Sequence, residues 1–437
     1  DTVVRGGTIV TDTVMDVSDI GITEGKIAAI GDLSRAPTNV TVEAKDLHIL
    51  PGIIDSQVHF REPGNEHKED LESGTRAAVL GGVTAIFEMP NTTPPTTTIE
   101  SFKHKLSRAK DRCHCDYGFF IGACKENIKD LPALEQLSGC AGVKIFMGSS
   151  TGTLLIPDDV MLEEVLSSGR RRAAVHAEDE DRMNERLPIR NSGGGPELHP
   201  QWRDVNTALL ATKRLIKLSR VHNRPVHVLH VTTADEINIL RKAKDIATVE
   251  CTPQHLTLVS PDCYNELGTY AQMNPPIRDE KHQRGLWEGV LDGTVDVLGS
   301  DHAPHTRAEK DAGYPNSPSG MPGVQTLLPI MLNHVHSGRL NLNRLVELTS
   351  TGPARIYGAI KKGKIKGGFD ADLTLVDLKR ECRISANWLA SKCGWSPFTD
   401  KKVTGWPVAT ILRGKTIMFH DELIGEPIGE AVTFEGT

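Results

Sequence analysis

The sequence predicts an α/β fold, namely a TIM-type (β/α)8 barrel with a small β-sandwich domain formed by both termini. The middle of the 437-residue chain alternates short apolar runs with helical patterns, and both ends read as short strands joined by turns. A chain of this length accommodates one large barrel and an accessory domain. We expect the small domain to comprise residues 1–50 and 366–437, and the barrel residues 51–365.

The middle of the chain contains eight candidate strands, each a short apolar run bounded by turn signals. They are Ile49–Val58, Val83–Met89, Tyr117–Ile121, Val143–Phe146, Ala173–His176, Val226–His230, Thr248–Cys251 and Val295–Leu298. Between them lie helical patterns, among them Glu69–Leu80, Asp159–Ser167, Val205–Val221 and Ala234–Ala243. Eight β/α units match a TIM barrel. A doubly wound open sheet is the main alternative, although no G-x-G-x-x-G follows an early strand.

The two ends of the chain show alternation and glycine punctuation typical of strands and turns. The N-terminal candidates are Val3–Val4, Gly7–Val10, Ile20–Ile22, Lys26–Ile30 and Val40–Glu43. The C-terminal candidates are Asp372–Asp377, Thr404–Arg413 and Gly414–Met418. Strands at both ends of a long α/β segment predict one small β domain to which both termini contribute.

Composition excludes several classes of protein. The formal net charge of −7 argues against a nucleic-acid binder. Apolar runs are too short to span a membrane, and the polar stretch Asp1–Gly7 lacks the layout of a signal peptide. The eight cysteines of this long chain form no disulfide framework, so we expect thiols in a reducing cytoplasm. Cys113-His114-Cys115 could alternatively be a metal knuckle, but no second pair follows at zinc-finger spacing.

Polar residues capable of metal or acid–base chemistry lie in or directly after five of the apolar runs. They are His59, Lys144, His176, His230 and Asp301. Because active sites of TIM barrels are built where the strands end, we expect these groups to converge at one mouth of the barrel. Imidazoles and a carboxylate around one point are the ligands of a hydrolytic metal centre.

Strand alternation helps to choose between neighbouring histidines. Gln57 and His59 are two residues apart and therefore face the same side. His227 and His230 are three apart, so we select His230, the last residue before a loop, and expect His227 to be structural. Either the ring of His176 or the carboxylate of Glu178 could face the pocket.

Asp301 follows a buried strand, where it could ligate a metal and accept a proton from water. The alternative is an N-cap of the next helix, which Pro304 disfavours. Lys144 lies between Val143 and Ile145, so a charged amine there would be costly unless it is paired. It is expected to be neutral, ion-paired or modified.

Three further residues are candidates for substrate recognition. Arg61 carries a donor fork suited to a carboxylate. Asn91 and Asn274 lie next to prolines in loops, with amides able to recognise a polar ring, although each could equally serve a turn.

Distinctive motifs lie along nearly the whole chain. They are Val58–Gly64 (VHFREPG), Glu66–Asp70, Gly74–Ala78, Gly81–Thr84, Met89–Thr92, His176–Asp179 (HAED), Leu229–Thr233, Met273–Arg278 (MNPPIR), Gly299–His305 (GSDHAPH), Ser319–Val324, Ser396–Phe398 and Gly405–Thr410. Together they resemble the motifs of the dihydroorotases of the amidohydrolase superfamily. The resemblance implies a (β/α)8 barrel with a small β domain, and reversible hydrolysis of dihydroorotate to N-carbamoyl-aspartate in pyrimidine biosynthesis.

The resemblance also implies roles for single residues. His59, His176, His230 and Asp301 would ligate zinc, one or two ions per chain. Lys144 would be a carboxylated lysine bridging two metals, or a nearby aspartate would serve instead, as in some dihydroorotases. Asp301 would also be the catalytic proton carrier. Arg61, Asn91 and His305 would hold the substrate carboxylate, while Asn274 and the backbone near Pro322 and Gly323 would meet the pyrimidine ring.

One position departs from the family pattern, which opens with His-x-His. Here the first residue is Gln57, whose amide oxygen is a weaker zinc ligand. Three functions are therefore weighed: an active dihydroorotase, another cyclic amidohydrolase such as an allantoinase or dihydropyrimidinase, and a non-catalytic partner of aspartate carbamoyltransferase. As partners we expect a small-molecule substrate, a homo-oligomer and association with that transferase.

Overall fold

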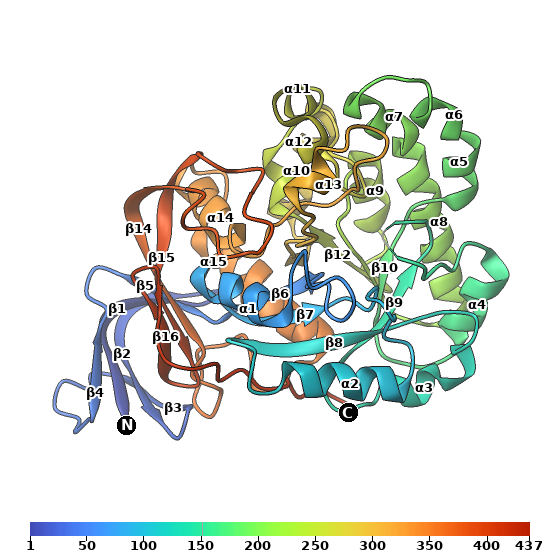
Figure 1. Ribbon diagram of the computed structural model, residues 1–437. Coiled ribbons are helices and arrows are strands. Elements are labelled where there is room, and N and C mark those ends of the chain that lie inside the picture. Colours follow the sequence, from blue (N-terminus) through green and yellow to red (C-terminus); the bar gives the residue numbers. More distant parts are fainter. Residues whose placement is uncertain (151) are drawn as a thin grey trace.

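The computed structural model describes residues 1–150 and 152–437 and contains two sheets (Figure 1). The larger sheet has eight parallel strands in sequential order. They are β6 (Ile53–Val58), β7 (Val83–Glu88), β8 (Asp116–Gly122), β9 (Cys140–Phe146), β10 (Ala173–His176), β11 (Val226–Val228), β12 (Ala247–Cys251) and β13 (Val297–Leu298). The prediction of eight barrel strands is therefore confirmed.

Hydrogen bonds between the first strand and the residues that follow the last one close the sheet into a barrel. The Ser300 amide donates to Asp55 Oδ1 (3.0 Å), and the His59 amide donates to the His302 carbonyl (2.7 Å). Val58 and His302 also form a parallel bridge. An open doubly wound sheet would leave these edges unpaired, so that alternative is wrong.

Helices fill the connections between the barrel strands and cover its outside (Figure 1). The longer ones are α1 (Leu71–Leu80), α2 (Ile99–Ala109), α4 (Asp159–Ser167), α8 (Val205–His222), α9 (Ala234–Leu240), α12 (Glu280–Asp292) and α14 (Leu327–His336). The short ones are α3 (Leu131–Leu134), α5 (Glu180–Glu185), α6 (Leu187–Arg190), α7 (His199–Trp202), α10 (Pro253–Thr257), α11 (Asp262–Leu267), α13 (Arg307–Lys310), α15 (Leu342–Val346) and α16 (Gly352–Tyr357).

The four helices expected from periodicity are all present, and their ends follow capping chemistry. Asp70 caps α1 by accepting from the Ser73 amide, and Thr233 caps α9 by accepting from the Glu236 amide. Satisfying these otherwise unpaired amides fixes where each helix begins. Helix α9 ends at Leu240, three residues before the predicted end at Ala243.

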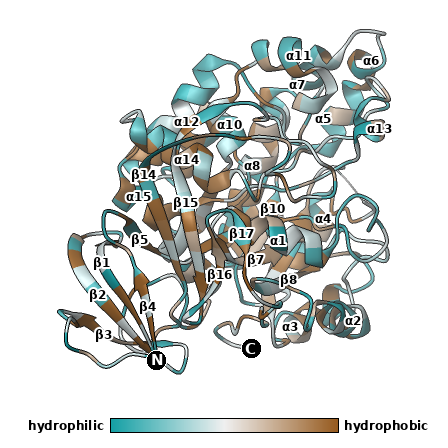
Figure 2. Cartoon of the chain, turned by 60° about the vertical axis from the view of Figure 1, so that its left-hand side comes forward, coloured by the Kyte–Doolittle hydropathy of each residue, from teal (hydrophilic) through white to brown (hydrophobic). Residues whose placement is uncertain are grey.

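The second sheet combines strands from both ends of the chain. They are β1 (Thr2–Val10), β2 (Met15–Thr23), β3 (Lys26–Gly31), β4 (Val40–Glu43), β5 (His48–Pro51), β14 (Leu373–Arg383), β15 (Lys402–Leu412), β16 (Lys415–Phe419) and β17 (Glu422–Leu423). Strand β5 joins the two halves, because it pairs with both β1 and β14. Apolar side chains from both halves, including Val4, Ile20 and Ile411, share one core. Figure 2 shows hydrophobic residues running along β1, β2 and β15.

One predicted strand is divided in the structure. Ile49–Val58 splits at Gly52 into β5, which belongs to the terminal sheet, and β6, which begins the barrel. A Cβ on Gly52 would lie 2.3 Å from Thr84 Oγ1, so only glycine fits where the chain passes between the sheets. The boundaries of the two domains at residues 50 and 366 stay a prediction.

The lower end of the barrel is filled by apolar side chains. Tyr357 and Phe434 pack edge-on against Phe87, with ring centroids 5.5 and 5.1 Å apart, and all three are buried. The barrel strands terminate at the opposite end. Within the described residues, no helix is both long and apolar enough to cross a membrane.

Candidate active site

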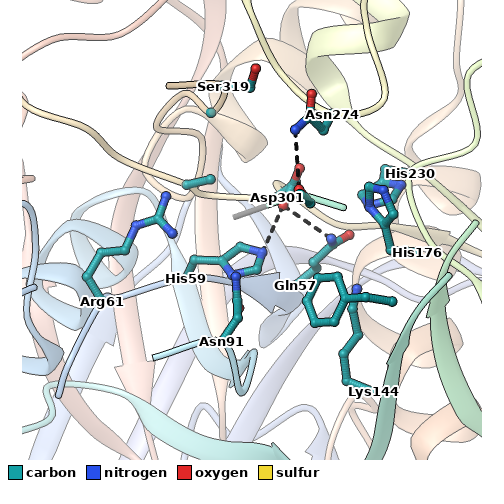
Figure 3. A pocket seen from close by; sticks show the side chains of 14 residues that line it. Gln57, His59, Arg61, Asn91, Lys144, His176, His230, Asn274, Asp301 and Ser319 are labelled. Carbon is teal, nitrogen blue, oxygen red and sulfur yellow. Dashed lines mark hydrogen bonds and ion pairs between the residues drawn. The ribbon is translucent and has the colours of Figure 1, made fainter. Parts of the chain in front are cut away.

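A pocket of about 340 Å³ lies at the carboxyl ends of the barrel strands (Figure 3). It is lined by Gln57, His59, Arg61, Asn91, Lys144, Phe146, Ser150, His176, His230, Asn274, Asp301, Ala303, Ser319 and Gly320. All five predicted metal-ligating residues are in this set, together with Arg61, Asn91 and Asn274. Strands β9 and β10 and the segments that follow β6, β7, β11, β12 and β13 bring them together.

Three predicted substrate-binding residues lie outside this lining. His305 is buried behind Arg61, with its Nε2 3.3 Å from Arg61 Nη2. Pro322 and Gly323 line a separate neighbouring cavity of about 210 Å³, beside His302. The loop faces the main pocket with Ser319 and Gly320 instead.

On one side of the pocket, His59 is held between two polar groups. Its Nδ1 lies 2.7 Å from Asn91 Oδ1, to which it donates because an amide oxygen only accepts. Its Nε2 therefore carries a lone pair and lies 3.2 Å from Asp301 Oδ1. Gln57 Nε2 donates to the same carboxylate oxygen at 3.2 Å. Burial lowers the pKa of His59, although the nearby negative charge of Asp301 opposes this.

On the other side, His176 and His230 face each other. His176 Nε2 lies 2.9 Å from Glu178 Oε2, and His176 Nδ1 lies 3.1 Å from His230 Nε2. The pocket is lined by the ring of His176, with Glu178 behind it, which decides between the two possibilities left open by the sequence. His227 lies outside the lining and hydrogen-bonds Thr248 Oγ1 at 2.8 Å, as expected of a structural histidine.

The donor atoms of this second group fit a metal ion. Glu178 accepts a hydrogen bond from the Nε2–H of His176, so the Nδ1 lone pair faces His230. Two zinc–nitrogen bonds of about 2.0–2.1 Å at a tetrahedral angle separate the nitrogens by about 3.4 Å, close to the observed 3.1 Å. His230 Nδ1 is buried and has no hydrogen-bond partner among the described residues. Nδ1 can therefore carry the proton of the neutral ring, which leaves the Nε2 lone pair facing His176.

The third ligand is less well defined. Across the described residues, no three His, Cys, Asp or Glu side chains lie close enough together to form a metal site by themselves. Lys144 and Asp301 border the two imidazoles in the same pocket (Figure 3). The Cys113-His114-Cys115 segment is no metal knuckle, because both cysteines are buried in the core and His114 Nε2 contacts Glu72 at 3.1 Å.

Lys144 is buried and makes no ion pair with any described residue. Its Nζ lies 4.6 Å from the centroid of the Phe146 ring. Burial lowers the pKa of Lys144 to about 7, and the charges of Asp301 and Glu250 limit the shift. The structural ion pair considered from the sequence is therefore wrong, and a neutral or modified amine is left.

Three residues of the site have left-handed backbone conformations. The φ angles are 64° at Arg61, 35° at His230 and 44° at Asp301. Such conformations are unfavourable for residues with a Cβ and concentrate at functional sites. Asp301 is also not a helix N-cap, since the next helix, α13, is capped by Thr306.

Arg61 forms a cationic wall of the pocket. Its Nε donates to the Pro304 carbonyl at 3.1 Å. Burial lowers its pKa to about 10, which leaves it charged at neutral pH. Behind it, His305 Nδ1 accepts from Lys68 Nζ (3.1 Å), so its Nε2 proton goes to the Ser319 carbonyl (3.0 Å). Burial and the neighbouring cations keep the pKa of His305 well below its usual range.

Asn274 closes the upper side of the pocket. Its Oδ1 accepts from His199 Nε2 at 3.0 Å, and its Nδ2 donates to Ser150 Oγ at 3.3 Å. Sequence reasoning missed Phe146, Ser150, Ala303, Ser319 and Gly320 as lining residues. Phe146 could have been found, because it is two residues after Lys144 in the same strand and so shares its face.

Comparison with known proteins agrees with this geometry. Residues 48–417 match the amidohydrolase family. The dihydroorotase of Halobacterium salinarum is 36% identical over 93% of this chain and 94% of that protein. The dihydroorotase of Pyrococcus furiosus is 35% identical, over 95% and 92% of the two chains.

Solved structures of two related kinds are also similar to this chain. An L-hydantoinase (dihydropyrimidinase) from Arthrobacter aurescens gives a TM-score of 0.95 at 30% identity and covers 99% of both chains. A D-hydantoinase structure gives a TM-score of 0.90 at 28% identity, over 98% of each chain.

Proposed function

Since the chain belongs to the amidohydrolase family and is a cyclic amide hydrolase, we propose that it is a zinc-dependent dihydroorotase. The proposed reaction is the reversible hydrolysis of the cyclic amide of (S)-dihydroorotate to N-carbamoyl-L-aspartate in de novo pyrimidine biosynthesis. The similarity to dihydroorotases over more than nine-tenths of the chain supports this substrate.

The observation that carries the proposal is the buried guanidinium of Arg61 in the pocket wall. A buried cation without an anionic partner is costly, and no ion pair of Arg61 is found within the described chain. A substrate carboxylate would supply that partner with two parallel hydrogen bonds. Dihydroorotate carries such a group, whereas a simple hydantoin or dihydropyrimidine does not.

The metal-holding residues we propose are His176, His230 and Lys144, the last as a carboxylated lysine, with His59 and Asp301 on the other side of the pocket. Zinc supplies Lewis acidity to such a site when bound. Asp301 takes the proton from the attacking water and delivers it to the leaving amide nitrogen. Hydrogen bonds from Gln57 and the contact with His59 hold its Oδ1 in place for that transfer.

The substrate would lie between Arg61 and Asn274. Arg61 binds the carboxylate, and the neutral His305 supports the loop that carries Ser319. Asn91 orients His59 through a hydrogen bond, in addition to the carboxylate contact expected from the resemblance. Asn274, held by His199, presents its amide to the ring. The contacts expected of Pro322 and Gly323 would be made by Ser319 and Gly320 instead.

Hydrolysis of a hydantoin or a dihydropyrimidine is the second candidate, favoured by the structural similarity to hydantoinases. Arg61 distinguishes the two, because a neutral ring has no group to pair with it. An allantoinase is disfavoured for the same reason. Cytoplasmic location, a homo-oligomeric state and association with aspartate carbamoyltransferase stay predictions from the sequence.

One experiment tests the proposal directly. Dihydroorotate hydrolysis and zinc content are measured on the same purified sample, with dihydrouracil and hydantoin as alternative substrates. We expect at least one zinc per chain and a clear preference for dihydroorotate, lost on chelation and restored by zinc. A zinc-loaded protein that prefers dihydrouracil would replace the proposal by the second candidate, and an unchelated sample without zinc would refute both.

A further inference from the structure

Glu178 lies directly behind His176, outside the lining of the pocket. Both carboxylate oxygens are already engaged. Oε2 accepts from His176 Nε2 at 2.9 Å, and the guanidinium of Arg203 donates through Nε to both oxygens at 3.1–3.2 Å. Glu178 is fully buried and Arg203 is 3% exposed. The pair is therefore held rigidly and kept from solvent.

Arg203 reaches a second part of the site with the same side chain. Its Nη2 donates to the carbonyl of Ser149. The next residue, Ser150, lines the pocket and accepts a hydrogen bond from Asn274 at 3.3 Å. A chain of direct contacts thus runs from His176 through Glu178 and Arg203 to the segment that borders the substrate-binding space.

The segment Gly148–Ser150 is packed closely against the same region. A Cβ on Gly148 would lie 2.6 Å from the Glu178 carbonyl oxygen. The amide and hydroxyl of Ser149 donate to Glu180, at 2.6 and 2.8 Å. The Ser149 carbonyl accepts from Arg203. Because Ser150 follows directly in the chain, its position depends on that guanidinium.

We propose that the buried Glu178–Arg203 ion pair positions two parts of the site at once: the imidazole of His176, and the Ser149–Ser150 border of the substrate pocket. Glu178 keeps the Nε2 proton in place and thereby presents Nδ1 to the metal, as carboxylates do for other metal-binding histidines. Arg203 neutralises Glu178 and fixes the Ser149 carbonyl. This inference rests on the proposed function, because it concerns the metal and substrate of that site.

The two parts of the proposal, at His176 and at Ser149, predict different effects on zinc affinity and on KM. Glu178→Gln removes the negative charge behind His176, so zinc affinity should fall about 10–100-fold and kcat should fall while KM for dihydroorotate changes little. Arg203→Met also frees Ser149, so KM should rise in addition. Arg203→Lys retains a positive charge beside Glu178, so zinc affinity should be higher than in Arg203→Met. A lysine cannot donate to both Glu178 and the Ser149 carbonyl, so KM should stay raised.

A matched control exists at the lower end of the barrel. Glu135 and Arg224 form an equally buried pair, 2.7 Å apart and 1% and 2% exposed, with Glu135 also accepting from the Arg170 amide. Glu135→Gln should lower thermal stability and leave zinc affinity and KM unchanged. Stability is measured for every variant, and Arg203→Lys keeps Glu178 paired if Glu178→Gln fails to fold.

Zinc affinity is measured with the metal alone, by competition with a chelator, and KM with dihydroorotate. Should both Glu178→Gln and Arg203→Met behave like Glu135→Gln, losing stability only, the proposal is overturned. A wild-type protein that binds zinc but does not hydrolyse dihydroorotate would refute the proposed function alone, since zinc affinity of the variants would still decide the role of Glu178. Unchanged KM in both Arg203 variants would refute the role at Ser149.

Discussion

Replacement of Arg61 by methionine removes the cation predicted to bind the substrate carboxylate while retaining most of the side-chain volume. A charge-assisted hydrogen bond contributes about 1.5–3 kcal/mol, and two of them would bind the substrate carboxylate. Allowing for incomplete additivity, the loss should be about 3–4 kcal/mol, or roughly 10²–10³-fold in kcat/KM for dihydroorotate. Most of it should appear in KM, because the carboxylate does not react.

The assay compares dihydroorotate with dihydrouracil, which lacks the carboxylate. Arg61→Met also loses the hydrogen bond from Nε to the Pro304 carbonyl, so some general loss is expected with both substrates. Only the difference between the substrates reports on carboxylate recognition, and Arg61→Lys, which keeps the charge, should recover part of it. Equal losses for both substrates, or an unchanged KM for dihydroorotate, would refute the reasoning.

Three other predictions concern the metal, the fold and pH. Gln57→His should raise the zinc content per chain by elemental analysis, because an imidazole replaces a weak amide ligand beside Asp301; an unchanged metal content would count against a half-formed second position. Lys362→Met should lower the free energy of unfolding by about 3–5 kcal/mol, since it leaves the buried Asp372 without its ion pair and takes one of two cationic partners from Asp116, which keeps Arg413. Arg220→Met, on an exposed pair, is the control in urea denaturation. Burial lowers the pKa of His334 in the folded protein to about 4. In the unfolded chain this histidine binds a proton near pH 6.5. The free energy of unfolding therefore falls as the pH drops from about 6.5 to 4, because only the unfolded chain gains a proton in that range. His334→Gln should reduce that fall by about 2–3 kcal/mol, and an identical pH dependence of the urea midpoint would contradict it.

The barrel could be predicted from local pattern because each strand and helix carries its own signal. Apolar runs between Ile53 and Leu298 recur at the spacing of β/α units, and caps such as Asp70 mark helix starts. The predicted strand Ile49–Val58 was wrong as a single element, because both of its halves are apolar and only their partners differ. Whether a strand pairs with β14 or with β7 is a long-range fact.

The site could be predicted as a set of residues but not as an arrangement. Parallel strands end at one face, so polar residues at their ends, such as His59 and His176, were expected to meet there. Which nitrogen of His176 faces the pocket depends on Glu178 and Arg203, which the fold brings from beyond the strand. The conformation of the loop likewise decides that Ser319 and Gly320, and not Pro322 and Gly323, line the pocket.

The sequence by itself determined the order of strands and helices, the share of each terminus in the second sheet and the identity of most polar groups at the barrel mouth, because alternation and periodicity act over a few residues. Tertiary structure alone decided the break at Gly52, the facing imidazoles of His176 and His230, and the unpaired burial of Lys144. Each of these depends on atoms contributed by segments distant in the chain, and no local pattern encodes how closely such segments approach.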